Sequence, residues 1–146
     1  MKKWQLVPLV ILFLSLSNFN PICAQSIDSF GKTIQEIRNM HNVAPCEVTP
    51  NEVLTYCVEN GDKISYMFEN NKVNGLMFST IYPTRYQAEK AFESEVDAFS
   101  KETKMMPFYN NGQALFSSPD NPLSIVYGVR EFAGNIYLVY YTFLKP

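Results

Sequence analysis

The sequence predicts an α+β fold in which two helices pack on one face of an antiparallel sheet. Three observations predict it. Two segments carry apolar residues at helical spacing, and each is followed by runs of strand-forming residues that hairpin turns separate. Both halves of the chain also repeat one order of elements, helix-βββ, so that the whole chain reads helix-βββ-helix-βββ. The halves, residues 25–84 and 85–146, are therefore candidates for an internal duplication.

The first 24 residues have the pattern of a secretory signal peptide. A positively charged start precedes an apolar run, Leu6–Leu16, and Ala24 ends a small-residue cleavage site. A run of about 11 residues is too short to cross a bilayer, which needs roughly 20. We therefore expect cleavage after Ala24 and a periplasmic or secreted protein with a single domain, residues 25–146. Lipid anchoring through Cys23 is the alternative.

Charge and cysteine count agree with export. Loss of the leader removes two of the 12 Lys and Arg residues, leaving 10 against 14 Asp and Glu, a formal charge of −4. Such a chain lacks the clustered basic surface that nucleic acid requires, and no second apolar run is long enough to span a membrane. Cys46 and Cys57 are the remaining cysteines, and an oxidising compartment allows a disulfide between them.

The first half starts with a helical pattern that Ser26 can cap and that Pro45 ends. Residues 43–51 are expected to form a connector. The hairpin signals Asn60-Gly61 and Asn70-Asn71 then separate three strands of a meander. The apolar stripe of the helix is Ile27, Phe30, Ile34, Ile37 and Met40, and the strands are Val53–Val58, Lys63–Glu69 and Val73–Ile81.

The second half starts with the capping box that Thr84 and Gln87 form. The apolar stripe of this second helix is Ala88, Phe92, Val96 and Phe99. Another face carries the acidic residues Glu89, Glu93 and Asp97. They are typical of a solvated helix surface, with a site for a cation or a basic partner as the alternative. The strands that follow are Gln113–Ser117, Leu123–Arg130 and Asn135–Leu144, the last two joined through Phe132-Ala133-Gly134.

Two-residue turns fix which strand residues share a face, because successive side chains alternate. Carried to the second half by matches at an offset of 61, such as Tyr66 with Tyr127, this register places an apolar face with Met77 under the helices. The opposite face mixes aromatic, Met and basic residues, as interfaces do. A second core layer under loops such as residues 105–111 is an alternative. The candidate binding residues on this opposite face are Leu54, Tyr56, Met67, Leu76, Phe78, Arg130, Tyr137, Val139 and Tyr141.

The sequence contains no pattern typical of catalysis. His41, the single histidine, is expected at an exposed helix end, and no G-x-S-x-G turn, phosphate loop or paired-histidine metal motif occurs. We therefore expect a non-enzymatic protein without cofactor or metal, whose open sheet face binds a protein or peptide of the cell envelope. The alternatives are a homodimer or larger homo-oligomer that buries the same face, and a carrier of a small molecule or lipid.

No motif identifies a family. In architecture only, the order of elements resembles small exported inhibitor proteins of the β-lactamase-inhibitor type. The resemblance implies that the sheet grips a partner protein.

Overall fold

The computed structural model describes residues 28–50, 53–58 and 60–145 of the 146-residue chain. The expected signal segment, Cys23 and the expected helix cap Ser26 lie outside these residues. Within the described part of the chain, no helix is both long and apolar enough to cross a membrane.

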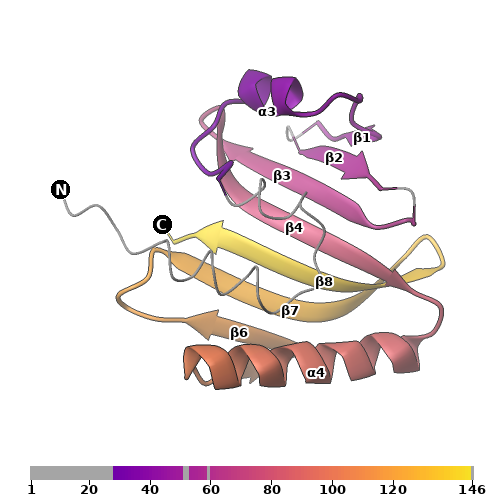
Figure 1. Cartoon of the computed structure of the whole chain (residues 1–146), viewed down its shortest axis with the longest axis vertical. Coiled ribbons are helices and arrows are strands. Elements are labelled where there is room, and N and C mark those ends of the chain that lie inside the picture. Colours follow the sequence, from indigo (N-terminus) through magenta and orange to yellow (C-terminus); the bar gives the residue numbers. More distant parts are fainter. Residues whose placement is uncertain (1–27, 51–52, 59, 146) are drawn as a thin grey trace.

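In the described residues, eight antiparallel strands form one sheet (Figure 1). The strand order is β1-β2-β3-β4-β8-β7-β6-β5, so the last strands of the two halves, β4 and β8, pair at the centre. Together with the two helices in the described part of the chain, this sheet confirms the α+β class. The strands are β1 (Glu47–Val48), β2 (Leu54–Cys57), β3 (Lys63–Glu69), β4 (Lys72–Tyr82), β5 (Phe108–Asn110), β6 (Gln113–Ser117), β7 (Leu123–Phe132) and β8 (Asn135–Leu144).

Each half contains four strands, not the three that were expected. The additional strands, β1 and β5, lie in segments that the sequence suggests to be connectors, and each forms one edge of the sheet. Both are short, two and three residues long, which is why no alternation pattern predicts them. The duplication of the two halves stays a prediction.

The first helix, α3 (Ile34–Met40), starts later than expected. The Thr33 side chain accepts a hydrogen bond from Glu36 N at 3.3 Å, and the Glu36 carboxylate accepts one from Thr33 N at 2.7 Å. This capping box starts the helix at Ile34. Residues 28–31 form a turn instead, and Gly31 has a positive φ of 81°. The expected inclusion of Phe30 in the helix is therefore wrong.

The second helix, α4 (Arg85–Thr103), starts as expected. The Thr84 side chain accepts a hydrogen bond from Gln87 N at 3.2 Å, which confirms the N-cap. Ala88, Val96 and Phe99 are buried against the sheet, where α4 packs on β4, β7 and β8. Figure 1 shows α4 at the bottom of the fold and α3 at the top.

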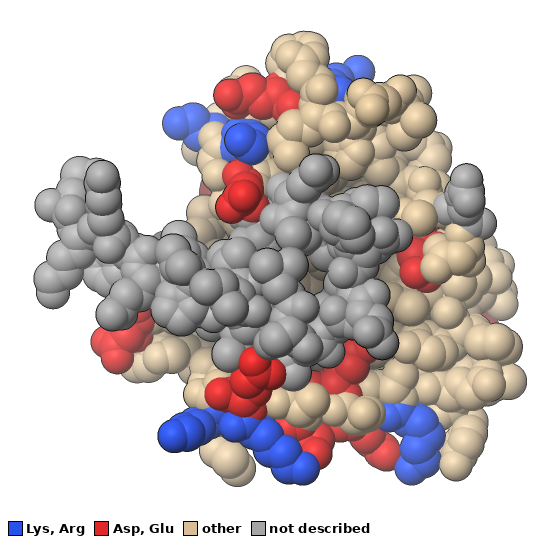
Figure 2. Space-filling view, in the orientation of Figure 1, with Lys and Arg blue, Asp and Glu red and all other residues tan. Residues whose placement is uncertain are grey.

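The three residues of the expected acidic stripe on α4 have basic partners, and Glu89 lies 3.9 Å from Arg85. Glu93 lies 3.0 Å from Lys90, and Asp97 lies 2.7 Å from Lys101. Figure 2 shows acidic and basic side chains interspersed at the bottom of the molecule, where α4 lies. The expected acidic stripe is therefore a surface of mixed charge, and it offers no isolated carboxylate cluster to a cation.

The β2–β3 hairpin differs from the expected register by one residue. Cys57 pairs with Lys63, so the turn is not the two-residue loop expected at Asn60-Gly61. A shift of one residue moves every side chain of a strand to the other face. Leu54 and Tyr56 therefore lie on the face that carries the helices, where they are 1% and 3% exposed.

A β-bulge changes the faces of β4 in the same way. Phe68 pairs with Val73, but its neighbour Met67 pairs with Gly75, so Asn74 is an extra residue in β4. Such a bulge reverses the alternation of all residues beyond it.

The placements expected for Leu76, Phe78 and Met77 are therefore wrong. Leu76 and Phe78 belong to the hydrophobic core, while Met77 lies on the opposite face of the sheet. Tyr127 marks the core face because its ring centroid lies 6.0 Å from that of Phe99 on α4. The cross-strand row that contains Tyr127 consists of Tyr56, Ile64, Phe78, Tyr140, Tyr127 and Ala114.

Candidate functional site

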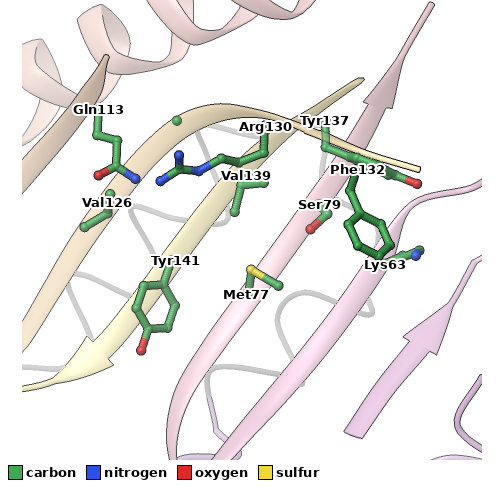
Figure 3. Close-up of a pocket in the computed structure, with 11 residues that line it drawn as sticks. Lys63, Met77, Ser79, Gln113, Val126, Arg130, Phe132, Tyr137, Val139 and Tyr141 are labelled. Carbon is green, nitrogen blue, oxygen red and sulfur yellow. The ribbon is translucent and has the colours of Figure 1, made fainter. Parts of the chain in front are cut away.

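A cavity of about 350 Å³ lies on the sheet face opposite α3 and α4 (Figure 3). We call this surface the cavity face. Strands β3, β4, β6, β7 and β8 all contribute side chains to it. Its lining residues are Lys63, Met77, Ser79, Gln113, Val126, Gly128, Arg130, Phe132, Tyr137, Val139 and Tyr141.

Small residues at the centre of the sheet account for the hollow. Residues that pair across neighbouring strands present their side chains on the same face. One row of such pairs crosses the cavity from β3 to β6 and consists of Lys63, Ser79, Val139, Gly128 and Gln113. Ser79 and Gly128 place little volume in the middle of this row, so space remains above them.

Gly128 also allows the side chain of Gln113 to lie across β7. A Cβ atom at position 128 would lie 3.3 Å from Gln113 Cγ and 3.6 Å from its amide nitrogen Nε2. The amide of Gln113 is therefore held above the glycine, at the β6 side of the cavity. A larger residue at position 128 would push this amide away.

Tyr141 forms an aromatic wall of the cavity. A Cβ atom at position 75 would lie 3.1 Å from Tyr141 Cε2, so Gly75 leaves the space in which the ring lies against β4. The ring also stacks on Phe143, with centroids 4.9 Å apart and planes 23° apart. Burial raises the pKa of the Tyr141 hydroxyl. The side chain therefore stays neutral at physiological pH and can donate a hydrogen bond.

Two basic side chains, Lys63 and Arg130, lie at the cavity, and none of its described lining residues is acidic. Lys63 Nζ is 5.8 Å from the ring centroid of Phe132 and 5.7 Å from that of Tyr137, which are cation–π distances. In Figure 3 the Arg130 guanidinium lies on the Gln113 side, and Lys63 lies beside Phe132. The apolar middle is thus flanked by positive charge.

The cavity brings together part of the predicted binding set. Four of the predicted residues line it: Arg130, Tyr137, Val139 and Tyr141. Met67 lies next to them, with Cε 3.4 Å from the position that a Cβ at Gly75 would take. The other predicted residues belong to the core, because the register shift and the bulge reverse their strands: Leu54, Tyr56, Leu76 and Phe78.

Sequence reasoning missed part of the lining. Met77 and Ser79 could be found only with the true pairing of β3 and β4, which the bulge hides. Lys63 is four residues before Met67 on β3, so alternation along that strand is the signal that could have found it. Phe132 lies beyond Arg130, where the strand was expected to end, although β7 continues to Phe132. Gln113 could be found only from its pairing with Gly128.

The single histidine lies outside the cavity. Its ring stacks on Tyr56 with centroids 3.6 Å apart, and Nε2 lies 2.9 Å from Tyr66 Oη. His41 is half-buried, so the exposed position expected for it is wrong. Burial lowers its pKa, which keeps the ring neutral. Among the described residues, no group of three His, Cys, Asp or Glu side chains could hold a metal ion.

The predicted disulfide between Cys46 and Cys57 is confirmed. The two Cα atoms are 5.9 Å apart, and the bond links the segment after α3 to the end of β2. Cys46 N also donates a hydrogen bond to Thr55 O at 2.8 Å, which fixes this segment against the sheet edge. A disulfide is compatible with an oxidising compartment.

Comparison with known protein families, with curated proteins and with solved structures finds no match to this chain.

Proposed function

We propose that this chain is an exported, non-catalytic binding protein that uses its cavity face to bind a protein or peptide of the cell envelope. The proposal rests on one observation, the cavity of about 350 Å³ lined by aromatic, Met and basic side chains. Aromatic residues and Arg are enriched where interfaces concentrate their binding energy. A cavity also supplies the pocket that a partner's anchoring side chain fills.

Three further observations support this proposal or other expectations from the sequence. The Cys46–Cys57 disulfide is compatible with export, as the leader pattern requires. The hydrogen bond and ring stacking of His41 support a structural role for the single histidine. The mirrored strand order about the β4–β8 pair supports an internal duplication of residues 25–84 and 85–146.

Export is tested by mass spectrometry of the protein from its native host. We expect an N-terminus at Gln25. Retention of the first residues, or a lipid-modified Cys23, would contradict the assignment.

Partner binding is tested by capture from the envelope fraction of the native host. Tyr141→Ala removes a wall of the cavity, and Tyr86→Ala, which alters a side chain on α4 that is 69% exposed, is the matched control. We expect the wild type and the control variant to capture the same protein and Tyr141→Ala to lose it. Removal of a central interface residue weakens the free energy of binding by about 2 kcal/mol or more. Equal capture by all three proteins would contradict the proposal.

A second candidate function is the transport of a small ligand. The cavity favours it, because its volume of about 350 Å³ lies within the range of small-molecule sites. Native mass spectrometry of the purified protein would detect a retained ligand. Size-exclusion chromatography with light scattering tests the remaining alternative, and a stable dimer that Tyr141→Ala dissociates would replace both candidates.

A further inference from the structure

The charges at the cavity are all of one sign. Lys63 and Arg130 are its charged lining residues, and no Asp or Glu belongs to the described lining. The protein as a whole has an excess of acidic residues, 14 against 12 basic ones. A basic, apolar cavity on an acidic chain therefore selects for ligands of negative charge.

These two basic side chains differ from those on α4. The ion-paired bases of α4 have carboxylate partners at 2.7 to 3.9 Å. No described residue forms an ion pair or a hydrogen bond with the guanidinium group of Arg130, and the Lys63 ammonium has cation–π contacts instead. Both cations are thus available to a ligand without the loss of an existing ion pair.

Arg130 and Gln113 together form a site suited to a carboxylate. A guanidinium group donates hydrogen bonds in the fork geometry that a carboxylate matches. The Gln113 amide adds a neutral donor, and it lies above Gly128, two residues before Arg130 on β7. Figure 3 shows both groups on the same side of the cavity.

The middle of the cavity is apolar, and its far side is again basic. Met77 and Val126 pair with Tyr141 from its two neighbouring strands, so these three side chains form an apolar row. In the next row along the strands, Lys63 lies on the β3 side beside Phe132 and Tyr137, and Val139 separates it from Gln113. The carboxylate site and the second cation thus lie on opposite sides of the cavity, with apolar side chains between and beside them.

We propose that the cavity binds an acidic peptide segment in which carboxylates flank a large apolar side chain. One carboxylate pairs with Arg130 and Gln113, the apolar side chain packs on Met77 and Tyr141, and a second carboxylate lies near Lys63. The proposal rests on the binding function proposed above and names the chemistry of the partner.

The probe is the peptide acetyl-Glu-Phe-Glu-amide, and its matched control is acetyl-Gln-Phe-Gln-amide. Each is titrated into the 15N-labelled protein, purified from cells that express the full chain, and followed by amide chemical shifts. We expect the acidic peptide to shift Ser79, Gly128 and Val139 and to bind at least about tenfold more tightly than the control, because charge-assisted hydrogen bonds are the stronger ones. Raising the salt concentration from about 50 to about 500 mM should weaken the binding of the acidic peptide, because salt screens the charges.

Variants locate the charge recognition. Arg130→Gln and Lys63→Gln should each lower the affinity for the acidic peptide by about fivefold or more. Neither variant should change the affinity for the neutral peptide. Lys101→Gln, on the surface of α4, is the control and should change neither. The dispersion of the amide spectrum verifies that each variant is folded.

Three results would overturn the inference. The neutral peptide could bind as tightly as the acidic one, the shifts could map away from the cavity, or decanoate could bind more tightly than the peptide, which would assign the cavity to a small carboxylate. The capture assay with the envelope fraction tests the proposed binding function separately. If Tyr141→Ala loses a partner that Arg130→Gln still captures, the binding function is supported and the acidic peptide is contradicted.

Discussion

The His41 ring stacks on Tyr56, with centroids 3.6 Å apart and planes 12° apart. Because His41 is the C-cap of α3 and Tyr56 belongs to β2, this contact fixes the end of the helix to the sheet. The hydroxyl of Tyr66 on β3 lies 2.9 Å from His41 Nε2 and ties the same ring to a second strand.

Acidification should weaken this attachment. The pKa of His41 is lowered by burial, so the unfolded chain takes up its proton more readily than the folded one. The contribution of His41 to stability is therefore complete above about pH 6.5 and is lost as the pH falls from there through the lowered folded pKa. We expect His41→Gln, which cannot titrate, to lose less stability than the wild type between pH 7.5 and 5. Urea unfolding measures both, and equal losses would contradict the prediction.

The hydroxyl groups of Tyr56 and Tyr66 should contribute differently to the free energy of unfolding. Tyr66→Phe removes the partner of His41 and should cost about 0.5–1.5 kcal/mol. Tyr56→Phe should cost nothing measurable, because the buried hydroxyl of Tyr56 has no hydrogen-bond partner among the described residues. Urea unfolding of the two variants under identical conditions gives the comparison. A larger loss for Tyr56→Phe would show that the assignment of partners is wrong.

The sequence predicts those elements that local chemistry determines. The Asn70-Asn71 turn has positive φ values of 51° and 61° at both residues, as a two-residue hairpin of this type needs, and the Thr84 N-cap is found where expected. The register of the strands beyond such turns and caps is not determined by local chemistry. One extra residue, Asn74, reverses the alternation of side chains from Gly75 to Tyr82, and no residue type at that position predicts a bulge.

The candidate site was predictable on one side only, for the same reason. Strand β8 has no bulge, and its pairing with β7 is regular from Asn135 to Leu144, so Tyr137, Val139 and Tyr141 lie on the expected face. The β4 side of the cavity depends on the bulge in the β3–β4 hairpin, because Met77 reaches this face only through the extra residue Asn74.

The charged carboxylate of Glu95 in α4 should lower the stability of the fold at neutral pH. Burial raises the pKa of Glu95, so the folded chain binds its proton more readily than the unfolded one. Its charged form therefore lowers stability above about pH 4.5, and this penalty disappears as the pH falls. We expect Glu95→Gln to stabilise the protein at pH 7, on the order of 1 kcal/mol, and to gain less at pH 4. Glu93→Gln, which removes the exposed ion pair with Lys90, is the control and should stay within about 0.5 kcal/mol.

The disulfide should make a measurable contribution to stability. Cys46 and Cys57 are separated by 11 residues, and closing a loop of that length contributes roughly 2–3 kcal/mol. Replacement of both cysteines by Ser should therefore lower the unfolding free energy by that amount. A reducing agent should lower the stability of the wild type equally and leave the double variant unchanged. Sensitivity of the double variant to the reductant would point to another cause.

The pairing of β4 with β8 also determines when the fold can be completed. The partners of Gly75 to Tyr82 lie 54 to 68 positions further along the chain. The central strand β4 therefore cannot complete its pairing until a segment that is synthesised much later is present. Pairings of such sequence separation are slow to form, because the closure of a long loop precedes any gain from the contacts. Until residues 135–144 arrive, β4 offers an unpaired edge of at least eight residues to other chains. Under the proposed export, translocation of the chain in an unfolded state, followed by folding of both halves together, would avoid that exposed intermediate.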